Sequence, residues 1–155
     1  MRDDNTISLE LPSYLKNYLL KLYGPQEPIR FKQRSLYNRL LLKYAGSWPT
    51  VMTRYHLMRK NELKIFMPAS PGRHPKRYSY LSKDDACFIR SEISMDFMSD
   101  YISFVKHKMR KGLLRSEATI LFMETYNISD SDLSYDAFYR YFSRREKKRK
   151  PYACK

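Results

Sequence analysis

The apolar and polar positions at the start of the chain predict a short strand followed by a helix. Thr6–Leu11 alternates polar and apolar residues, which is the period of a half-buried strand. Pro12 then suits the first turn of a helix. The leucines of this helix fall at the spacing of one helical face, at Leu15, Leu19 and Leu22. A Gly-Pro pair at positions 24 and 25 ends the helix.

Shorter elements follow in the middle of the chain. A helix is predicted over Ser35–Tyr44, with Ser35 as its N-cap. Glu62–Met67 alternates again and predicts a second strand, and the proline-rich stretch Pro68–Pro75 predicts a loop. Two further stretches are too short to assign from their pattern and could be strands, Pro28–Phe31 and Tyr78–Tyr80.

The longest predicted helix begins after Ser82. Ser82 is suited to cap this helix, and Asp85 lies three positions on as the acid of a capping box. One apolar stripe continues along the helix through Ile89, Ile93, Phe97, Tyr101 and Val105. Acidic residues dominate the first half and basic residues the end, which agrees with the helix dipole. Gly112 is a good C-terminal stop.

Two shorter helices are predicted towards the C-terminus, over Ser116–Tyr126 and Ser134–Lys148, with turn residues at Asn127–Asp130. One side of the last helix carries Phe138, Tyr141, Phe142 and Arg145. The other side carries Tyr139, Arg140, Ser143, Arg144 and Lys147. This suits a helix-turn-helix, in which one side holds the helix to its scaffold and the other enters a groove. The alternative is a helical hairpin with a solvated basic tail, because the connection is long for a helix-turn-helix.

Together these elements predict a mainly α protein with a few short β-strands (α+β) and a helix-turn-helix-like helical pair near the C-terminus. We expect a strand and helix region over residues 1–81. A helical region is expected over residues 82–150, and a tail over residues 151–155.

The composition of the 155-residue chain narrows its class. A hydrophobic fraction of 43% supports a packed core rather than a disordered chain. No apolar run approaches the ~20 residues of a membrane span, and the first residues lack the pattern of a secretory signal. Cys87 and Cys154 do not make a disulfide framework. We therefore expect a cytoplasmic protein that has no membrane partner.

Residues suited to catalysis are not grouped along the sequence. His56, His74 and His107 are isolated rather than placed at metal-ligand spacing. The four glycines are separate, so there is no Gly-rich phosphate loop. The fourteen tyrosines are better explained as core or interface residues than as nucleophiles. The prediction is a protein that is not an enzyme and that needs no cofactor or metal.

Charge is concentrated in two blocks. The net charge is +14. Residues 30–64 carry nine basic side chains against Glu62, and residues 140–155 carry eight against Glu146, whereas residues 65–139 hold ten of each sign. Clustered basic charge predicts a nucleic-acid-binding surface, because an evenly solvated surface would not leave the middle of the chain neutral.

The function favoured by this pattern is binding of double-stranded DNA by a non-enzymatic regulator or accessory protein. The candidate contact residues of the C-terminal block are Arg140, Ser143, Arg144, Lys147, Lys148 and Arg149, and those of the first block are Arg30, Arg34 and Arg39. Arginine can pair with phosphate or guanine, and lysine and serine mainly hold phosphate. A single-strand or RNA binder, and a protein-interaction adaptor whose charge gives solubility, are the alternatives. Homodimer formation stays open.

Two resemblances bear on this prediction. The order of strand, helix, link and helix over Thr6–Ala45 resembles the ribbon–helix–helix repressors, in which a paired strand enters the major groove, although Glu10 suits phosphates poorly. Four further stretches, the last followed by a basic tail, are Ile7–Leu19, Leu22–Gly24, Ile120–Ser129 and Leu133–Phe142. They resemble the corresponding parts of small basic proteins of bacterial phages and mobile elements. That similarity implies a mobile-element setting and a DNA-binding or replication-accessory role, without catalytic residues.

Overall fold

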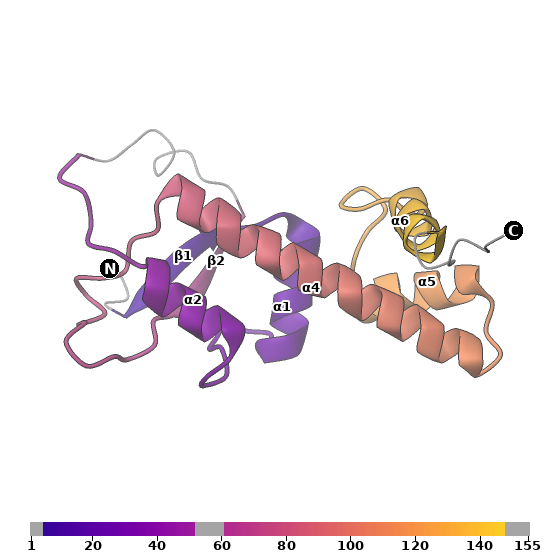
Figure 1. The fold of residues 1–155 in the computed structure, drawn as a ribbon, viewed down its shortest axis with the longest axis horizontal. Coiled ribbons are helices and arrows are strands. Elements are labelled where there is room, and N and C mark those ends of the chain that lie inside the picture. Colours follow the sequence, from indigo (N-terminus) through magenta and orange to yellow (C-terminus); the bar gives the residue numbers. More distant parts are fainter. Residues whose placement is uncertain (1–4, 52–60, 148–155) are drawn as a thin grey trace, which may run out of the picture. The chain divides into compact units, whose positions relative to one another are not determined.

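A computed structural model describes residues 5–51 and 61–147 and confirms a mainly α fold with a small sheet (Figure 1). The elements in chain order are β1 (Thr6–Glu10), α1 (Ser13–Tyr23), α2 (Leu36–Tyr44), β2 (Glu62–Phe66), α4 (Lys83–Arg110), α5 (Arg115–Thr125) and α6 (Tyr135–Lys147). The chain divides into two compact units, residues 1–95 and residues 96–155. The first part of α4 belongs to unit 1 and the rest to unit 2.

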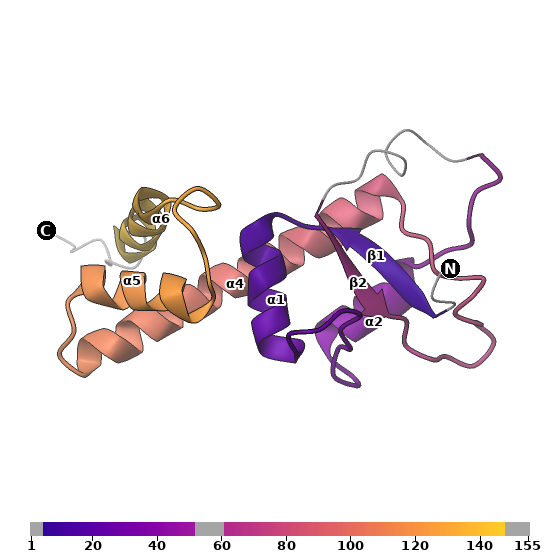
Figure 2. The same cartoon turned by 180° about the vertical axis from the view of Figure 1, so that it is seen from behind.

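The sheet of unit 1 pairs the two predicted strands with each other. β1 and β2 run antiparallel (Figure 2). Their register joins Thr6 to Phe66 and Glu10 to Glu62. Their alternation places one apolar face in the core, formed by Ile7, Leu9, Leu63 and Ile65. β1 therefore has a partner strand from its own chain, whereas a ribbon–helix–helix repressor pairs this strand with that of a second chain.

The two short stretches that could not be assigned make isolated bridges rather than strands. Ile29 lies beside β2, where its N–H donates to the Lys64 carbonyl at 3.0 Å and its own carbonyl accepts from the Phe66 N–H at 2.8 Å. Tyr80 exchanges two backbone hydrogen bonds with Gly46, at 2.8 and 3.1 Å. Each stretch thus adds a single bridge that ties a loop to the rest of unit 1.

Two helices of unit 1, α2 and α4, begin where the sequence places their caps. The Ser35 hydroxyl accepts a hydrogen bond from the Asn38 N–H at 3.2 Å, as an N-cap does. The Ser82 hydroxyl likewise accepts from the Asp85 N–H at 3.1 Å at the start of α4. Apolar residues of α1, α2 and the first part of α4 join the sheet in the core, at Leu15, Tyr18, Leu19, Tyr37, Leu41, Ala86, Ile89 and Ile93.

Unit 2 is built around buried aromatic rings from α4, α5 and α6. The Tyr101 ring lies 5.2 Å from the Phe122 ring and 4.6 Å from the Phe138 ring, measured between centroids. Phe97 lies 5.6 Å from Phe122. We call this group, completed by Phe142, the aromatic cluster; all five side chains are at most 1% exposed. Each helix of the unit therefore contributes to one core.

The two helix ends of unit 2 that precede a turn share one motif. After α4, the Gly112 N–H donates to the Met109 carbonyl and the Leu113 N–H to the Lys108 carbonyl, with Gly112 at φ +95°. After α5, Asn127 takes the same place at φ +53°. Both ends have the hydrogen bonds of a Schellman motif, in which a left-handed residue suits glycine or asparagine. These stops set the directions in which α5 and the next connection leave.

Replacing Phe122 by Ala is expected to lower the free energy of unfolding by ~3–5 kcal/mol, because the ring is fully buried among aromatic neighbours and leaves a cavity. Urea denaturation followed by circular dichroism measures the change. Ile120→Ala on the same helix is the control, since Ile120 is 51% exposed and its truncation is expected to cost less than about 1 kcal/mol. Equal destabilisation of the two variants would contradict the proposed core.

Candidate nucleic-acid interface

The aromatic cluster fixes which side of α6 faces solvent. Phe138 and Phe142 are 0% and 1% exposed, and their rings lie 4.6 and 6.3 Å from that of Tyr101. Figure 1 views α6 nearly end-on, whereas α5 lies across the picture, so the two helices cross steeply. The predicted docking of α6 is therefore confirmed for Phe138 and Phe142.

The opposite side of α6 carries the predicted arginines. Arg140 and Arg144 are exposed, as is Tyr139. Ser143 is half-buried, and its hydroxyl donates a hydrogen bond to the Tyr139 carbonyl at 2.9 Å. The hydroxyl proton of Ser143 is therefore engaged within the helix. Lys147 is the last residue of α6, and two other predicted DNA-binding residues, Lys148 and Arg149, lie outside the described residues.

Arg145 differs from its predicted place on the docked side. It falls on the stripe of Phe138 and Phe142, yet it is exposed. The buried positions of α6 end at Phe142 within the described side chains, so the last turn is no longer covered. Together with Arg140 and Arg144 it gives α6 three exposed arginines beyond its first turn, which we call the α6 arginines.

Arg115, at the start of α5, covers the exposed tyrosine of α6. Its guanidinium carbon lies 3.5 Å from the centre of the Tyr139 ring and 5.3 Å from that of Phe142, within cation–π range. Thr119, one turn further along α5, donates to the Arg115 carbonyl at 2.9 Å and shares a 3.0 Å hydrogen bond with the Tyr101 hydroxyl. The start of α5 is thus linked to both α6 and α4.

The three candidates of the first basic block are exposed in unit 1, and the structure brings two of them together. Arg34 and Arg39 line one surface hollow of about 450 Å³ at the start of α2. Arg34 has φ +63°, in the turn before the N-cap of α2. Arg30 instead places its guanidinium over the Phe66 ring, 4.6 Å from its centre. Arg30 does not line that hollow.

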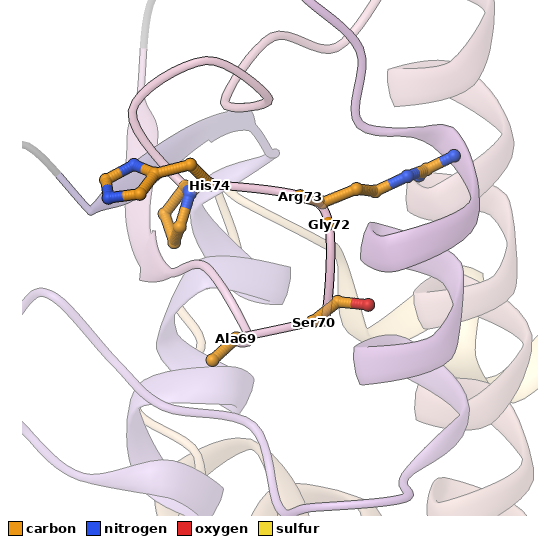
Figure 3. Close-up of a pocket in the computed structure, with 6 residues that line it drawn as sticks. Ala69, Ser70, Gly72, Arg73 and His74 are labelled. Carbon is orange, nitrogen blue, oxygen red and sulfur yellow. The ribbon is translucent and has the colours of Figure 1, made fainter.

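A basic loop of unit 1 adjoins α2, although the sequence marks this stretch only as a loop. Ser70–Arg73 forms a turn in which the Arg73 N–H donates to the Ser70 carbonyl at 3.1 Å and Gly72 has φ +75°. The Arg73 guanidinium donates to the carbonyl of Leu42, a residue that also lines the hollow of Arg39. Figure 3 shows Arg73 and His74 extending to opposite sides of the loop.

The loop that contains this turn carries basic residues that the sequence does not single out. Arg73, Lys76 and Arg77 are all exposed, and the hydrogen bond of Arg73 brings the loop to the side of α2 that carries Arg39. A Ser-Pro-Gly-Arg turn can be recognised in the sequence, but its interaction with Leu42 cannot. Residues 65–139 hold equal numbers of basic and acidic side chains, so their net charge does not reveal that three basic side chains lie in one loop.

Chemistry other than charge is sparse at these surfaces. His74 is exposed, and its Nδ1 accepts from the Lys76 N–H at 3.3 Å. Within residues 5–51 and 61–147, no three His, Cys, Asp or Glu side chains are grouped to hold a metal ion. In the same ranges no helix has the length and apolar character needed to cross a membrane.

No protein-family model, curated protein or solved structure was found to match this chain.

Tyr101 links the stability of this interface to pH. Burial raises the pKa of Tyr101 above its usual value, although its hydrogen bond to Thr119 and the charge of Arg115 oppose the rise. A phenol whose pKa is higher in the folded state adds stability at pH values below its unfolded pKa of about 10, and this stability is lost as pH rises through the folded value. Burial also raises the pKa of Tyr126.

Replacing Tyr101 by Phe is expected to weaken the fall in stability above pH 10 without abolishing it, because Tyr126 still titrates. At neutral pH the variant should be less stable by about 1 kcal/mol, because the hydrogen bond to Thr119 is absent. Urea denaturation from neutral to alkaline pH measures both effects. Tyr139→Phe, at an exposed ring, is the control. A Tyr101→Phe profile parallel to that of wild type would show that Tyr101 does not titrate on unfolding.

Proposed function

We propose that this chain binds double-stranded DNA as a non-enzymatic regulator or accessory protein, and that the α6 arginines provide one contact surface. The observation that supports this most directly is the arrangement of α6, whose aromatic side is buried while Arg140, Arg144 and Arg145 face solvent. Exposed arginines on a fixed helix form a positive surface that can meet phosphates without first being ordered. The mobile-element setting stays a prediction from sequence resemblance.

Charge along α6 favours contact through the part of the helix that follows its first turn. A helix-turn-helix usually reads bases with the N-terminal residues of its recognition helix. Here Asp136 lies in the first turn, and Asp130 accepts a hydrogen bond from the Tyr135 N–H at 2.8 Å just before it. These carboxylates would lie against phosphates and weaken such a docking. We therefore infer phosphate gripping by the α6 arginines rather than base reading by the start of α6.

The basic surface of unit 1 is a second candidate for DNA contact. This surface has five exposed basic side chains. Two lie at the start of α2, Arg34 and Arg39, and three in the adjoining loop, Arg73, Lys76 and Arg77. Two surfaces of this kind, one in each unit, can neutralise more phosphates than either alone. This predicts a steep dependence of affinity on salt.

Tyr139 favours duplex over single-stranded nucleic acid. Single-strand binders stack bases on open aromatic faces. The guanidinium of Arg115 already lies over the Tyr139 ring at 3.5 Å. One face of this exposed ring is therefore occupied, and the arginines remain available to a backbone of closely spaced phosphates.

Replacing Arg140 and Arg144 together by Ala is expected to weaken binding to a fluorescently labelled mixed-sequence duplex. The binding free energy should fall by about 1–3 kcal/mol for each arginine that reads a base and by less for one that touches only phosphate. Fluorescence anisotropy measures the affinity. Lys21→Ala with Lys83→Ala is the matched control, because it removes the same charge from exposed positions outside both surfaces. An equal weakening in the control, or no duplex binding at low salt, would overturn the proposal.

The salt dependence separates the two surfaces. If roughly six phosphates are neutralised, log K should fall against log salt with a slope of about −5 for duplex DNA. Arg34→Ala with Arg39→Ala should reduce the magnitude of that slope by about 0.9 for each phosphate that the variant no longer neutralises. Anisotropy titrations over a salt series measure the slope. If the slope does not change, the surface of α2 does not touch the DNA.

A further inference from the structure

A surface groove of unit 2 differs in character from the basic surfaces. It has a volume of about 670 Å³ and lies on α5, the following connection and the start of α6. Ile120, Met123, Ile128 and Tyr135 supply its apolar wall, and Glu124 and Asp130 its carboxylates. A concave apolar site with a few placed polar groups is the usual form of a binding pocket.

Ile120 gives this groove an apolar surface that water still reaches. Its side chain is 51% exposed, whereas Met123 and Ile128 are 9% and 6% exposed. A single exposed isoleucine is common on protein surfaces, but Ile120 lines the same groove as the apolar side chains of Met123 and Ile128. A bulky apolar side chain placed there would cover Ile120 and remove its exposed half from water.

Charge around the groove selects the kind of partner. Residues 116–139 contain no Lys or Arg in a chain of net charge +14, and their five acidic residues are Glu117, Glu124, Asp130, Asp132 and Asp136. All five are exposed. Exposed carboxylates of this kind repel phosphate and attract lysine and arginine.

The backbone of the groove is held by its own hydrogen bonds. The Asn127 N–H donates to the Glu124 carbonyl at 3.1 Å, and the Ile128 N–H to the Met123 carbonyl at 2.8 Å. The Asp130 carboxylate accepts from the Tyr135 N–H at 2.8 Å. A site fixed in this way loses little conformational entropy when a ligand binds.

We propose that this groove docks a segment of a second protein in which a bulky apolar side chain is flanked by Lys or Arg. The apolar side chain packs on Ile120, Met123 and Ile128, and the flanking cations lie near Glu124 and Asp130. A second copy of this chain suits the groove less well, because two molecules of charge +14 repel each other. This docking function goes beyond DNA binding and uses none of the α6 arginines.

A labelled synthetic peptide of leucine and lysine at helical spacing is the probe, with a leucine–glutamate peptide of the same pattern for comparison. We expect the full chain to bind the lysine peptide more tightly. Ile120→Ser and Glu124→Lys should each weaken that binding by about tenfold, which corresponds to ~1.4 kcal/mol. Met95→Ser and Asp84→Lys are matched controls at exposed positions outside the groove and should leave the affinity unchanged. Anisotropy measures all affinities.

Four outcomes would overturn the proposal. They are no binding of the lysine peptide at about 1 mM, equal binding of the two peptides, equal weakening in the controls, and a wild-type dimer in sedimentation equilibrium that Ile120→Ser converts to monomer. The last would assign the groove to a second copy. Circular dichroism confirms that each variant is folded. Duplex binding by Ile120→Ser should match wild type, and Arg140→Ala with Arg144→Ala should keep peptide binding, so the two proposals fail separately.

Discussion

Packing of Phe122 and Phe138 against Tyr101 is the interaction on which both proposed binding surfaces of unit 2 depend. These rings bring α4, α5 and α6 onto one core, and the hydroxyl of Tyr101 reaches Thr119, which holds the Arg115 carbonyl. The orientation of α6 about its own axis follows from this packing. A helix that buried another stripe would turn its arginines inward and would have neither its core nor its basic surface.

The sequence predicted local structure well because that structure depends on nearby residues. Caps at Ser35 and Ser82, the stop at Gly112 and the aromatic side of α6 are each encoded within a few positions. Partners far apart were not accessible in this way. The pairing of β1 with β2 needs a register that alternation alone does not specify, and the bridge at Ile29 rests on the hydrogen bonds of a single residue.

The candidate interface was predicted in part for the same reason. Periodicity placed Arg140 and Arg144 on the solvent side of α6 correctly, but it placed Arg145 on the docked side, because periodicity does not show where a core ends. The basic loop escaped prediction, since its position depends on the hydrogen bond between Arg73 and the Leu42 carbonyl. A count of charge over residues 65–139 also combined the basic side chains of this loop with the acidic side chains of the helices that follow, so the loop did not stand out.

Helix stability explains some of the charge asymmetry of unit 2 and leaves one residue unexplained. The helix dipole favours acids at the start of a helix and bases at its end, by about 0.3–1 kcal/mol each. Asp136 in α6 and Glu117 in α5 lie at favourable starts. Glu124 lies in the last turn of α5, which has no basic residue, so the dipole disfavours it. Because Glu124 lines the apolar groove, a partner's cation there would offset that cost and give this carboxylate a role.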